Sequence, residues 1–287
     1  MIEPFAQPHA ASEPIEGEYQ PPGSGKPSAW KRAGAAAVGI GLLFAKFKGL
    51  LFFLLNIKWI LIGSKVLLSS LSFLASIWVY ALLWGWKFGI AFTLLLLVHE
   101  LGHMIFMRAF GIPATLPYFI PGLGAFVAMK GRPASVLAQA YIALGGPFVG
   151  SICALAAGAY GAATGEPFWI AVAYTGFFIN LFNLFPVLPL DGGQIVGAIS
   201  PRIWIVGLVA LVVAAVAFHW FNPLIFILIL LSIPQAVAAF RGQLDQRYFT
   251  LTTPQRFGVA CAYFGLAGLL FCAMLAARVP PVAHNLG

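Results

Sequence analysis

Two histidines and a glutamate stand close enough in the sequence to share one chemical task, in the run His99-Glu100-Leu101-Gly102-His103. On a helix, positions i and i+4 lie on one face, so both imidazoles can reach the same metal ion. Neutral imidazole suits Zn²⁺, and the glutamate beside the first ligand can take a proton from a water molecule at the metal. The structural alternative is a pair of histidines that hydrogen-bond neighbouring helices. We favour zinc, because this pattern seldom arises by chance in a chain with five histidines.

A catalytic zinc site needs a third protein ligand and an open position. Of the eight acidic residues, only Glu100 and Asp191 lie within or at the end of a long apolar segment, where an ionisable group is costly and is usually functional. Asp191 follows a stretch in which Pro186 and Pro189 prevent a regular helix, so its carboxylate can turn towards a protein-lined cavity. The residues alone leave two roles open for Asp191, third metal ligand or ordinary helix cap.

The composition indicates which class of protein must position these residues. Hydrophobic residues make up 61% of the 287 residues and charged residues 8%, whereas soluble domains carry about 25% charged residues. This predicts an all-α polytopic protein embedded in a lipid bilayer. The net charge of +8 does not indicate nucleic-acid binding, because the basic residues stand singly between apolar stretches and form no dense patch for a phosphate backbone.

Apolar segments long enough to cross the bilayer as helices fill most of the chain, and they predict about six to seven transmembrane helices. They lie at about 66–86, 88–109, 134–160, 168–190, 202–220, 223–240 and 255–277. We therefore expect one transmembrane domain at 66–277, whose catalytic core, with the candidate metal ligands, covers about 88–200.

The remaining parts of the chain have other compositions. Residues 1–32 are rich in proline and glutamate and predict a flexible cytosolic tail, and residues 278–287 form a short C-terminal tail. Residues 33–65 are apolar, but lysines at 46, 48 and 58 interrupt them. We therefore expect a helix that lies in the membrane interface.

The positions of the basic residues predict the orientation of the protein. If the N-terminus is cytosolic and the seven segments alternate in direction, only Lys87 and Arg278 of the 16 Lys and Arg residues lie outside. This satisfies the positive-inside rule, and the opposite orientation violates it. We expect an integral protein of the cell (inner) membrane with a cytosolic N-terminus.

The stretch 111–133 is apolar but does not resemble a spanning helix, because it holds four prolines and several glycines. Within it, residues 125–129 can form a short strand. Non-helical chain is tolerated at membrane depth only where it folds against protein. We therefore expect a re-entrant β-hairpin that enters from the cytosolic side.

Two further motifs accompany the histidines and carry a resemblance to a known family. They are Asn183-x-x-Pro186-x-x-x-Leu190-Asp191-Gly192 and Leu144-Gly145-Gly146-Pro147. With the histidine motif, and in this order over about 88–200, they resemble the site-2 protease family of intramembrane zinc metalloproteases. The hairpin at 111–133 is similar to that family's re-entrant strands. No PDZ or CBS module of the kind that many members carry is evident in the sequence.

The resemblance implies a role for each site residue. Zinc would be bound by His99, His103 and Asp191, with Glu100 as general base, and Asn183 would be a polar contact to the substrate backbone or oxyanion. The implied activity is that of a zinc-dependent metalloendopeptidase, a hydrolase that cuts peptide bonds in or near the transmembrane segments of membrane-protein substrates.

The alternative is a non-proteolytic membrane metal-binding protein or transporter. A transporter predicts further ionisable residues along the spans, and the sequence offers almost none. The intact H-E-x-x-H pattern argues against a relative that has lost its activity.

Overall fold

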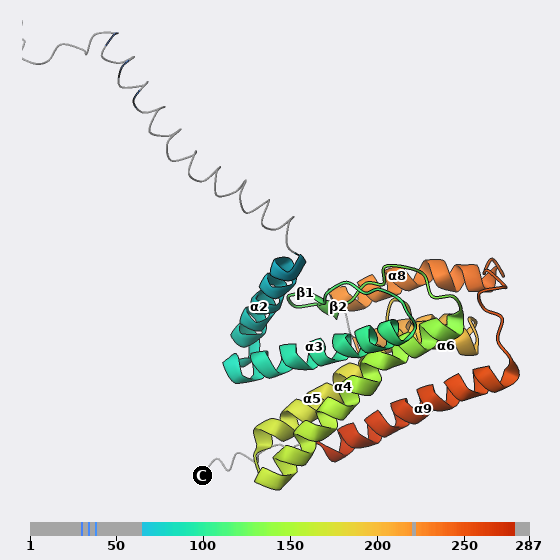
Figure 1. The fold of residues 1–287 in the computed structure, drawn as a ribbon. Coiled ribbons are helices and arrows are strands. Elements are labelled where there is room, and N and C mark those ends of the chain that lie inside the picture. The colour runs from blue at the N-terminus through green and yellow to red at the C-terminus, as the bar shows by residue number, and fades with distance from the viewer. Residues whose placement is uncertain (1–29, 31–33, 35–37, 39–64, 220–221, 279–287) are drawn as a thin grey trace, which may run out of the picture. The chain divides into compact units, whose positions relative to one another are not determined.

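The computed structural model describes residues 65–219 and 222–278, together with Trp30, Gly34 and Val38 (Figure 1). Those three single residues belong to a separate unit, Met1–Ile60, and the others to Leu61–Gly287. The interfacial helix predicted at 33–65 and the tails predicted at 1–32 and 278–287 lie almost entirely outside the described residues.

Helices form most of the described chain, and one short hairpin lies between α3 and α4 (Figure 1). The elements are α2 Lys65–Trp84, α3 Trp86–Ala109, β1 Tyr118–Ile120, β2 Gly124–Phe126, α4 Val136–Thr164, α5 Pro167–Asn183, α6 Asp191–Ile199, α7 Ile203–Ala217, α8 Pro223–Phe240 and α9 Thr253–Ala276. Each apolar segment predicted from the sequence overlaps one of these helices.

Five helices of the described chain, α2, α3, α4, α8 and α9, are long and apolar enough to cross a membrane. Helices α5 and α7 have 17 and 15 residues, or about 26 and 23 Å at 1.5 Å per residue, which is short of a ~30 Å hydrocarbon core. The predicted fold class, an all-α polytopic membrane protein with a β-hairpin, is confirmed.

Helix α4 packs against the three helices that carry the candidate site, α3, α5 and α6. Its contact with α3 is close because both helices have glycine there. A Cβ atom on Gly102 of α3 would overlap the Gly145 carbonyl of α4. Small residues allow such an approach between membrane helices, where dispersion contacts replace the hydrophobic effect as the main attraction.

The hairpin is antiparallel, and Tyr118, Phe119 and Ile120 of β1 lie opposite Phe126, Ala125 and Gly124 of β2. A further bridge joins Ala114 to Met129, so the paired chain extends beyond the two named strands. The expected strand at 125–129 thus corresponds to β2 together with the residues that follow it.

Helix α2 holds the hairpin in place through two serines. The Ser69 hydroxyl donates to the Pro117 carbonyl at 2.6 Å, and the Ser72 hydroxyl accepts from the Phe119 N–H at 3.2 Å. The Phe119 side chain is buried among apolar side chains from α2 and α3. These bonds satisfy backbone groups that lipid cannot satisfy.

The chain between α5 and α6 is not helical, as Pro186 and Pro189 predict. The Tyr263 hydroxyl of α9 donates to the Leu184 carbonyl at 2.6 Å, and the Ser232 hydroxyl of α8 donates to the Leu188 carbonyl. Helix α9 thus holds the first residue of the 184–190 segment, and α8 holds its middle. These two contacts determine where α6 begins.

Arg256 of α9 binds the other end of α6. Its guanidinium donates to the Ala198 and Ile199 carbonyls at 3.2 and 2.8 Å. A cation at a helix C-terminus satisfies orphan carbonyls and complements the helix dipole.

Candidate metal centre

His99 and His103 lie on one face of α3, as their spacing predicts, and both are buried, at 4% and 7% exposure. Their Nε2 atoms are 3.1 Å apart. The Asp191 Oδ2 atom, from the first residue of α6, lies 3.1 Å from His99 Nε2 and 3.3 Å from His103 Nε2. The structure therefore brings together three residues that can hold one metal ion.

The other nitrogen of each imidazole is already bonded. His99 Nδ1 donates to Asn180 Oδ1 at 2.8 Å, and His103 Nδ1 donates to the Ile142 carbonyl at 2.9 Å. The Asn180 amide is oriented by its own Nδ2 atom, which donates to the Gly176 carbonyl at 2.7 Å. Oxygen acceptors on both Nδ1 atoms place the proton of each neutral imidazole there.

Three electron-rich atoms consequently converge on one buried point. Both Nε2 atoms carry lone pairs, and Asp191 Oδ2 is buried without a hydrogen-bond donor among the described residues. Such an arrangement is costly unless a cation lies between the three atoms. Two imidazoles whose second nitrogens are bonded to oxygen, together with one carboxylate, are the usual surroundings of a protein metal ion. The residues fit a metal site.

Two glycines on α4 make room for this arrangement. A Cβ atom on Gly146 would overlap the His103 ring, and one on Gly150 would overlap the Asn180 amide. The two glycines are one helical turn apart on the same face of α4. Because neither residue has a side chain, the candidate ligand His103 and the supporting Asn180 can pack directly against that helix.

Asp191 does not act as a helix cap. The N-cap of α6 is Leu190, and no side chain caps this end of the helix. Gly192 and Gly193 allow the first turn of α6 to pack directly on the backbone of Leu184 and Val187. Of the two roles that the sequence leaves open for Asp191, the geometry agrees with the metal ligand.

Glu100 is buried beside the ligands, at 6% exposure. Its carboxylate lies close to His99, His103 and Asp191, and the backbone N–H of Val127 faces it. The chain that follows β2 therefore reaches the same site as α3 and α6. A carboxylate in this place can accept a proton from a molecule held at the metal.

Asn183 lies apart from this network. Its Nδ2 atom donates to the Ile179 carbonyl of its own helix at 3.1 Å, and it has no polar contact with the candidate ligands in the described chain. The residue that touches a ligand is Asn180, which was not among the predicted site residues. The available signal was a second amide one helical turn before Asn183 in an apolar helix.

Residues 87–166 match the model of peptidase family M50. The match confirms the predicted site-2 protease family. It includes the H-E-x-x-H run on α3 and the small-residue motif on α4, and it ends before Asp191. The family that matches is one of metallopeptidases, and the five long apolar helices of the described chain indicate an integral membrane protein. No curated protein and no solved structure matches the chain.

Proposed function

We propose that the protein is an intramembrane zinc metalloendopeptidase that hydrolyses peptide bonds in or near the transmembrane segments of membrane-protein substrates. The observation that carries the proposal is the convergence of His99 Nε2, His103 Nε2 and Asp191 Oδ2 inside a group of apolar helices. Two imidazoles and one carboxylate suit Zn²⁺ and leave a position for water or substrate.

The reaction divides between the metal and Glu100. When bound by the three ligands, zinc supplies Lewis-acid polarisation of a water molecule and of the scissile carbonyl. Glu100 accepts a proton from that water and transfers it to the leaving amine. The backbone N–H of Val127 faces the Glu100 carboxylate. Asn183 is proposed as a polar contact to the substrate backbone or to the developing oxyanion.

The free edge of the hairpin is the proposed receptor for unwound substrate. The Ala128 carbonyl accepts from the Thr115 N–H at 2.9 Å, and the Lys130 N–H donates to the Pro113 carbonyl at 2.7 Å, so these residues face the first strand. Because backbone groups alternate along an extended chain, Val127 and Met129 face the other side. A helical substrate must unwind before cleavage, and this edge offers it backbone partners that lipid lacks.

The orientation proposed from the sequence places the N-terminus in the cytosol and the protein in the cell (inner) membrane. It rests on the positive-inside rule, because only Lys87 and Arg278 lie outside in that arrangement. The hairpin, the loop between α5 and α6, and the loop between α8 and α9 then lie on the cytosolic side.

Transport of metal ions is the competing function, and it requires ionisable groups along a path. In the five spanning helices of the described chain, the single acidic residue is Glu100. A path needs more than one such group, whereas a hydrolytic site needs one base beside the metal.

Glu100→Gln separates the two functions, because it removes the base and keeps the three ligands. We expect the purified variant to contain about one zinc per chain, as the wild type does, and to cleave nothing. The readouts are zinc content by mass spectrometry and the transmembrane fragments that differ between wild-type and variant membranes. Cleavage by Glu100→Gln, or a wild type without bound zinc, would contradict the proposal. Metal uptake without any fragment would favour the transporter.

A further inference from the structure

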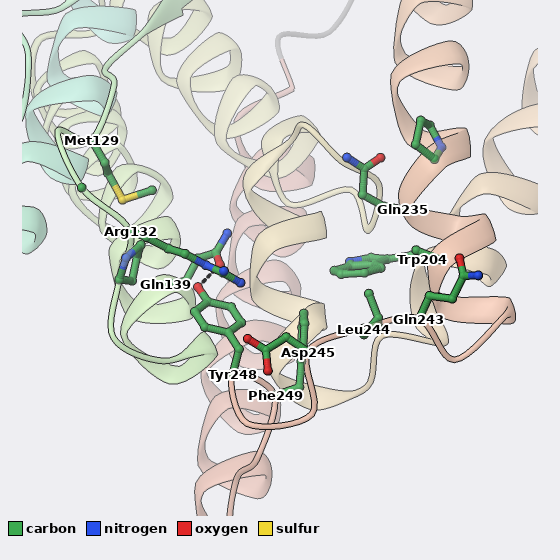
Figure 2. Close-up of a pocket in the computed structure, with 14 residues that line it drawn as sticks. Met129, Arg132, Gln139, Trp204, Gln235, Gln243, Leu244, Asp245, Tyr248 and Phe249 are labelled. Atoms are coloured by element: carbon green, nitrogen blue, oxygen red, sulfur yellow. Dashed lines mark hydrogen bonds between the residues drawn. The ribbon is translucent and has the colours of Figure 1, made fainter.

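An open cavity of about 760 Å³ lies among the first turns of α4 and α7, the end of α8 and the loop between α8 and α9 (Figure 2). Its polar and aromatic lining includes Arg132, Gln139, Trp204, Gln235, Gln243 and Asp245. None of these residues has a part in the metal site or in the hydrolysis proposed above.

One wall of the cavity is built from fixed contacts. The Arg132 guanidinium lies over the Tyr248 ring, 4.2 Å from its centroid, and the Tyr248 hydroxyl donates to Gln139 Oε1 (Figure 2). Burial raises the pKa of the Tyr248 hydroxyl against the opposing effect of Arg132, so the phenol remains a donor. The Val136 N–H also donates to the Tyr248 carbonyl at 3.1 Å, which ties the loop to α4.

Other polar groups in the cavity remain available to a ligand. The Gln235 Oε1 atom is buried and lacks a hydrogen-bond partner among the described residues. The Gln243 side chain is exposed, and no hydrogen bond engages it in the described chain. Glutamine amides both donate and accept hydrogen bonds, as peptide groups do, so this lining suits a polypeptide backbone.

The cavity is continuous with the free edge of the hairpin. The Val127 N–H faces Glu100, and Met129 and Gly131 line the cavity two and four residues later. At about 3.3 Å per residue, an extended chain covers the distance from Val127 to Gly131 in roughly 13 Å. A substrate segment paired with this edge at the metal site therefore leads into the cavity.

The cavity also contacts the helix that carries Asp191. The Gln139 amide donates to Gln194 Oε1 at 3.3 Å, and the Trp204 indole donates to the Gly193 carbonyl at 2.6 Å. Two lining residues therefore bond the first turn of α6, which begins at Asp191.

The surroundings of the cavity carry positive charge. Asp245 is the acidic residue in the lining, and its Oδ1 atom already accepts from the Arg247 N–H at 3.1 Å. Arg132 in the lining keeps N–H donors beyond its contact with one ring. Four exposed basic residues lie within two positions of a lining residue in the sequence: Lys130, Arg202, Arg241 and Arg247. This charge favours an acidic ligand.

We propose that the cavity binds an acidic, extended polypeptide segment that flanks the transmembrane part of the substrate. Arg132 receives a carboxylate of that segment, and the glutamine amides receive its main chain. The inference rests on the proposed function, and it adds a subsite that selects substrates by the charge of their flanks.

The test measures binding without cleavage, in the full-length, zinc-loaded Glu100→Gln variant. The probe is a ten-residue peptide of alternating Asp and Ser with a benzophenone label, and matched Asn–Ser and Lys–Ser peptides are the controls. We expect the acidic peptide to crosslink most strongly, and we expect the label to lie within 129–139 or 235–249.

Single charges at Gln243 test the cavity itself, because no hydrogen bond holds that side chain in the described chain. Gln243→Glu should lower crosslinking of the acidic peptide about two- to fivefold, and Gln243→Lys should raise it by a similar factor. Gln246→Glu is the matched control, since Gln246 is exposed in the same loop and lies outside the lining. It should leave the crosslinking unchanged.

The proposal is overturned if crosslinking does not respond to the charge at position 243, or if Gln246→Glu has the same effect. Protection of the cavity from crosslinking in phosphatidylglycerol nanodiscs, but not in phosphatidylcholine nanodiscs, would instead assign it to anionic lipid headgroups and also overturn the proposal. The proposed function fails by a different result, which is an absence of cleavage by the wild type. The binding assay uses a variant that does not cleave, so its outcome does not depend on that result.

Discussion

His99 and Asn180, 81 residues apart in the sequence, share a buried hydrogen bond of 2.8 Å between His99 Nδ1 and Asn180 Oδ1. The bond joins α3 to α5 on the side of the imidazole that faces away from Asp191. It fixes both the tautomer and the rotation of the ring, so that Nε2 points at the metal position. Asn180 is thus a positioning residue rather than a ligand.

Asn180→Ala should weaken metal binding by about 10- to 100-fold, because the His99 ring loses the acceptor that orients it. The measurement is zinc affinity in competition with a chelator. Asn183→Ala is the matched control, since Asn183 is the same residue type on the same helix without a bond to a ligand. It should retain zinc and lose cleavage. Equal zinc affinity of wild type and Asn180→Ala would remove the positioning role.

Asp191→Ala should lower zinc content to the level of His99→Ala and His103→Ala, because each variant deletes one of three ligands. Asp245→Ala is the control for loss of an aspartate, since Asp245 lies in the loop between α8 and α9, outside the metal site. Zinc content and thermal stability are measured together. If Asp191→Ala binds zinc and cleaves like the wild type, the third ligand is misassigned.

Gly146→Ala should disturb the metal site without touching a ligand, because the new Cβ atom would overlap the His103 ring. Overpacking of this kind typically costs about 1–3 kcal/mol. We expect lower zinc content and a lower melting temperature. Gly265→Ala on α9 is the control, because a Cβ atom there meets nothing within 4 Å. Normal zinc binding by Gly146→Ala would show that the ring tolerates displacement.

Proline substitutions test whether the free edge of the hairpin holds substrate. Val127→Pro should cut proteolysis sharply while zinc binding survives, and Val127→Ala should be mild because its N–H remains. The Val127 N–H also reaches Glu100, so a second variant is needed to isolate the edge. Met129→Pro removes an N–H that faces the free edge of the hairpin and that Glu100 does not contact. We expect this variant to have a higher KM for the substrate.

Ala128→Pro provides the contrast, because the Ala128 N–H donates inward to the Thr115 hydroxyl at 3.0 Å. It should destabilise the hairpin, and a change in limited proteolysis of the hairpin should report this. Wild-type cleavage by both Val127→Pro and Met129→Pro would show that the edge does not hold substrate, although the zinc chemistry could stand.

The proposed orientation predicts which positions react with impermeant thiol reagents in intact cells. Single cysteines are placed at positions 10, 164 and 245 of a variant that lacks the native Cys153, Cys261 and Cys272. The cysteine at position 164, at the end of α4, should be labelled from outside, and those at positions 10 and 245 should be protected. The reverse pattern would overturn the orientation.

Local patterns in the sequence predicted the histidine pair, the membrane helices and the hairpin. The spacing of His99 and His103 needs only helical geometry to place both rings on one face. The apolar segments predict membrane helices because desolvation of a helix depends on the residues of that segment alone. The prolines and glycines of 111–133 predict a break in the helices because they restrict the backbone locally. For the same reason, Pro186 and Pro189 predicted that the chain before Asp191 would not be helical.

The tertiary structure decided which side chains support the ligands. The motif indicated Asn183, whereas Asn180 is the residue that reaches His99. The face of α5 that meets α3 is determined by close packing at two glycines: Gly176 lies against Leu95 and Ala154, and Gly150 leaves room for the Asn180 amide. No local pattern in α5 records those distant contacts.

The same holds for the role of Asp191 and for the free edge of the hairpin. The sequence left two roles open for Asp191, metal ligand or helix cap. Helix α6 packs against α4, α9 and the 184–190 segment, and its first residue, Asp191, lies with its carboxylate beside both histidines. The pairing of Ala128 with Thr115 determines that Val127 faces Glu100. A strand shifted by one residue would present its opposite side, and register is fixed by pairing across the hairpin rather than by the residues of one strand.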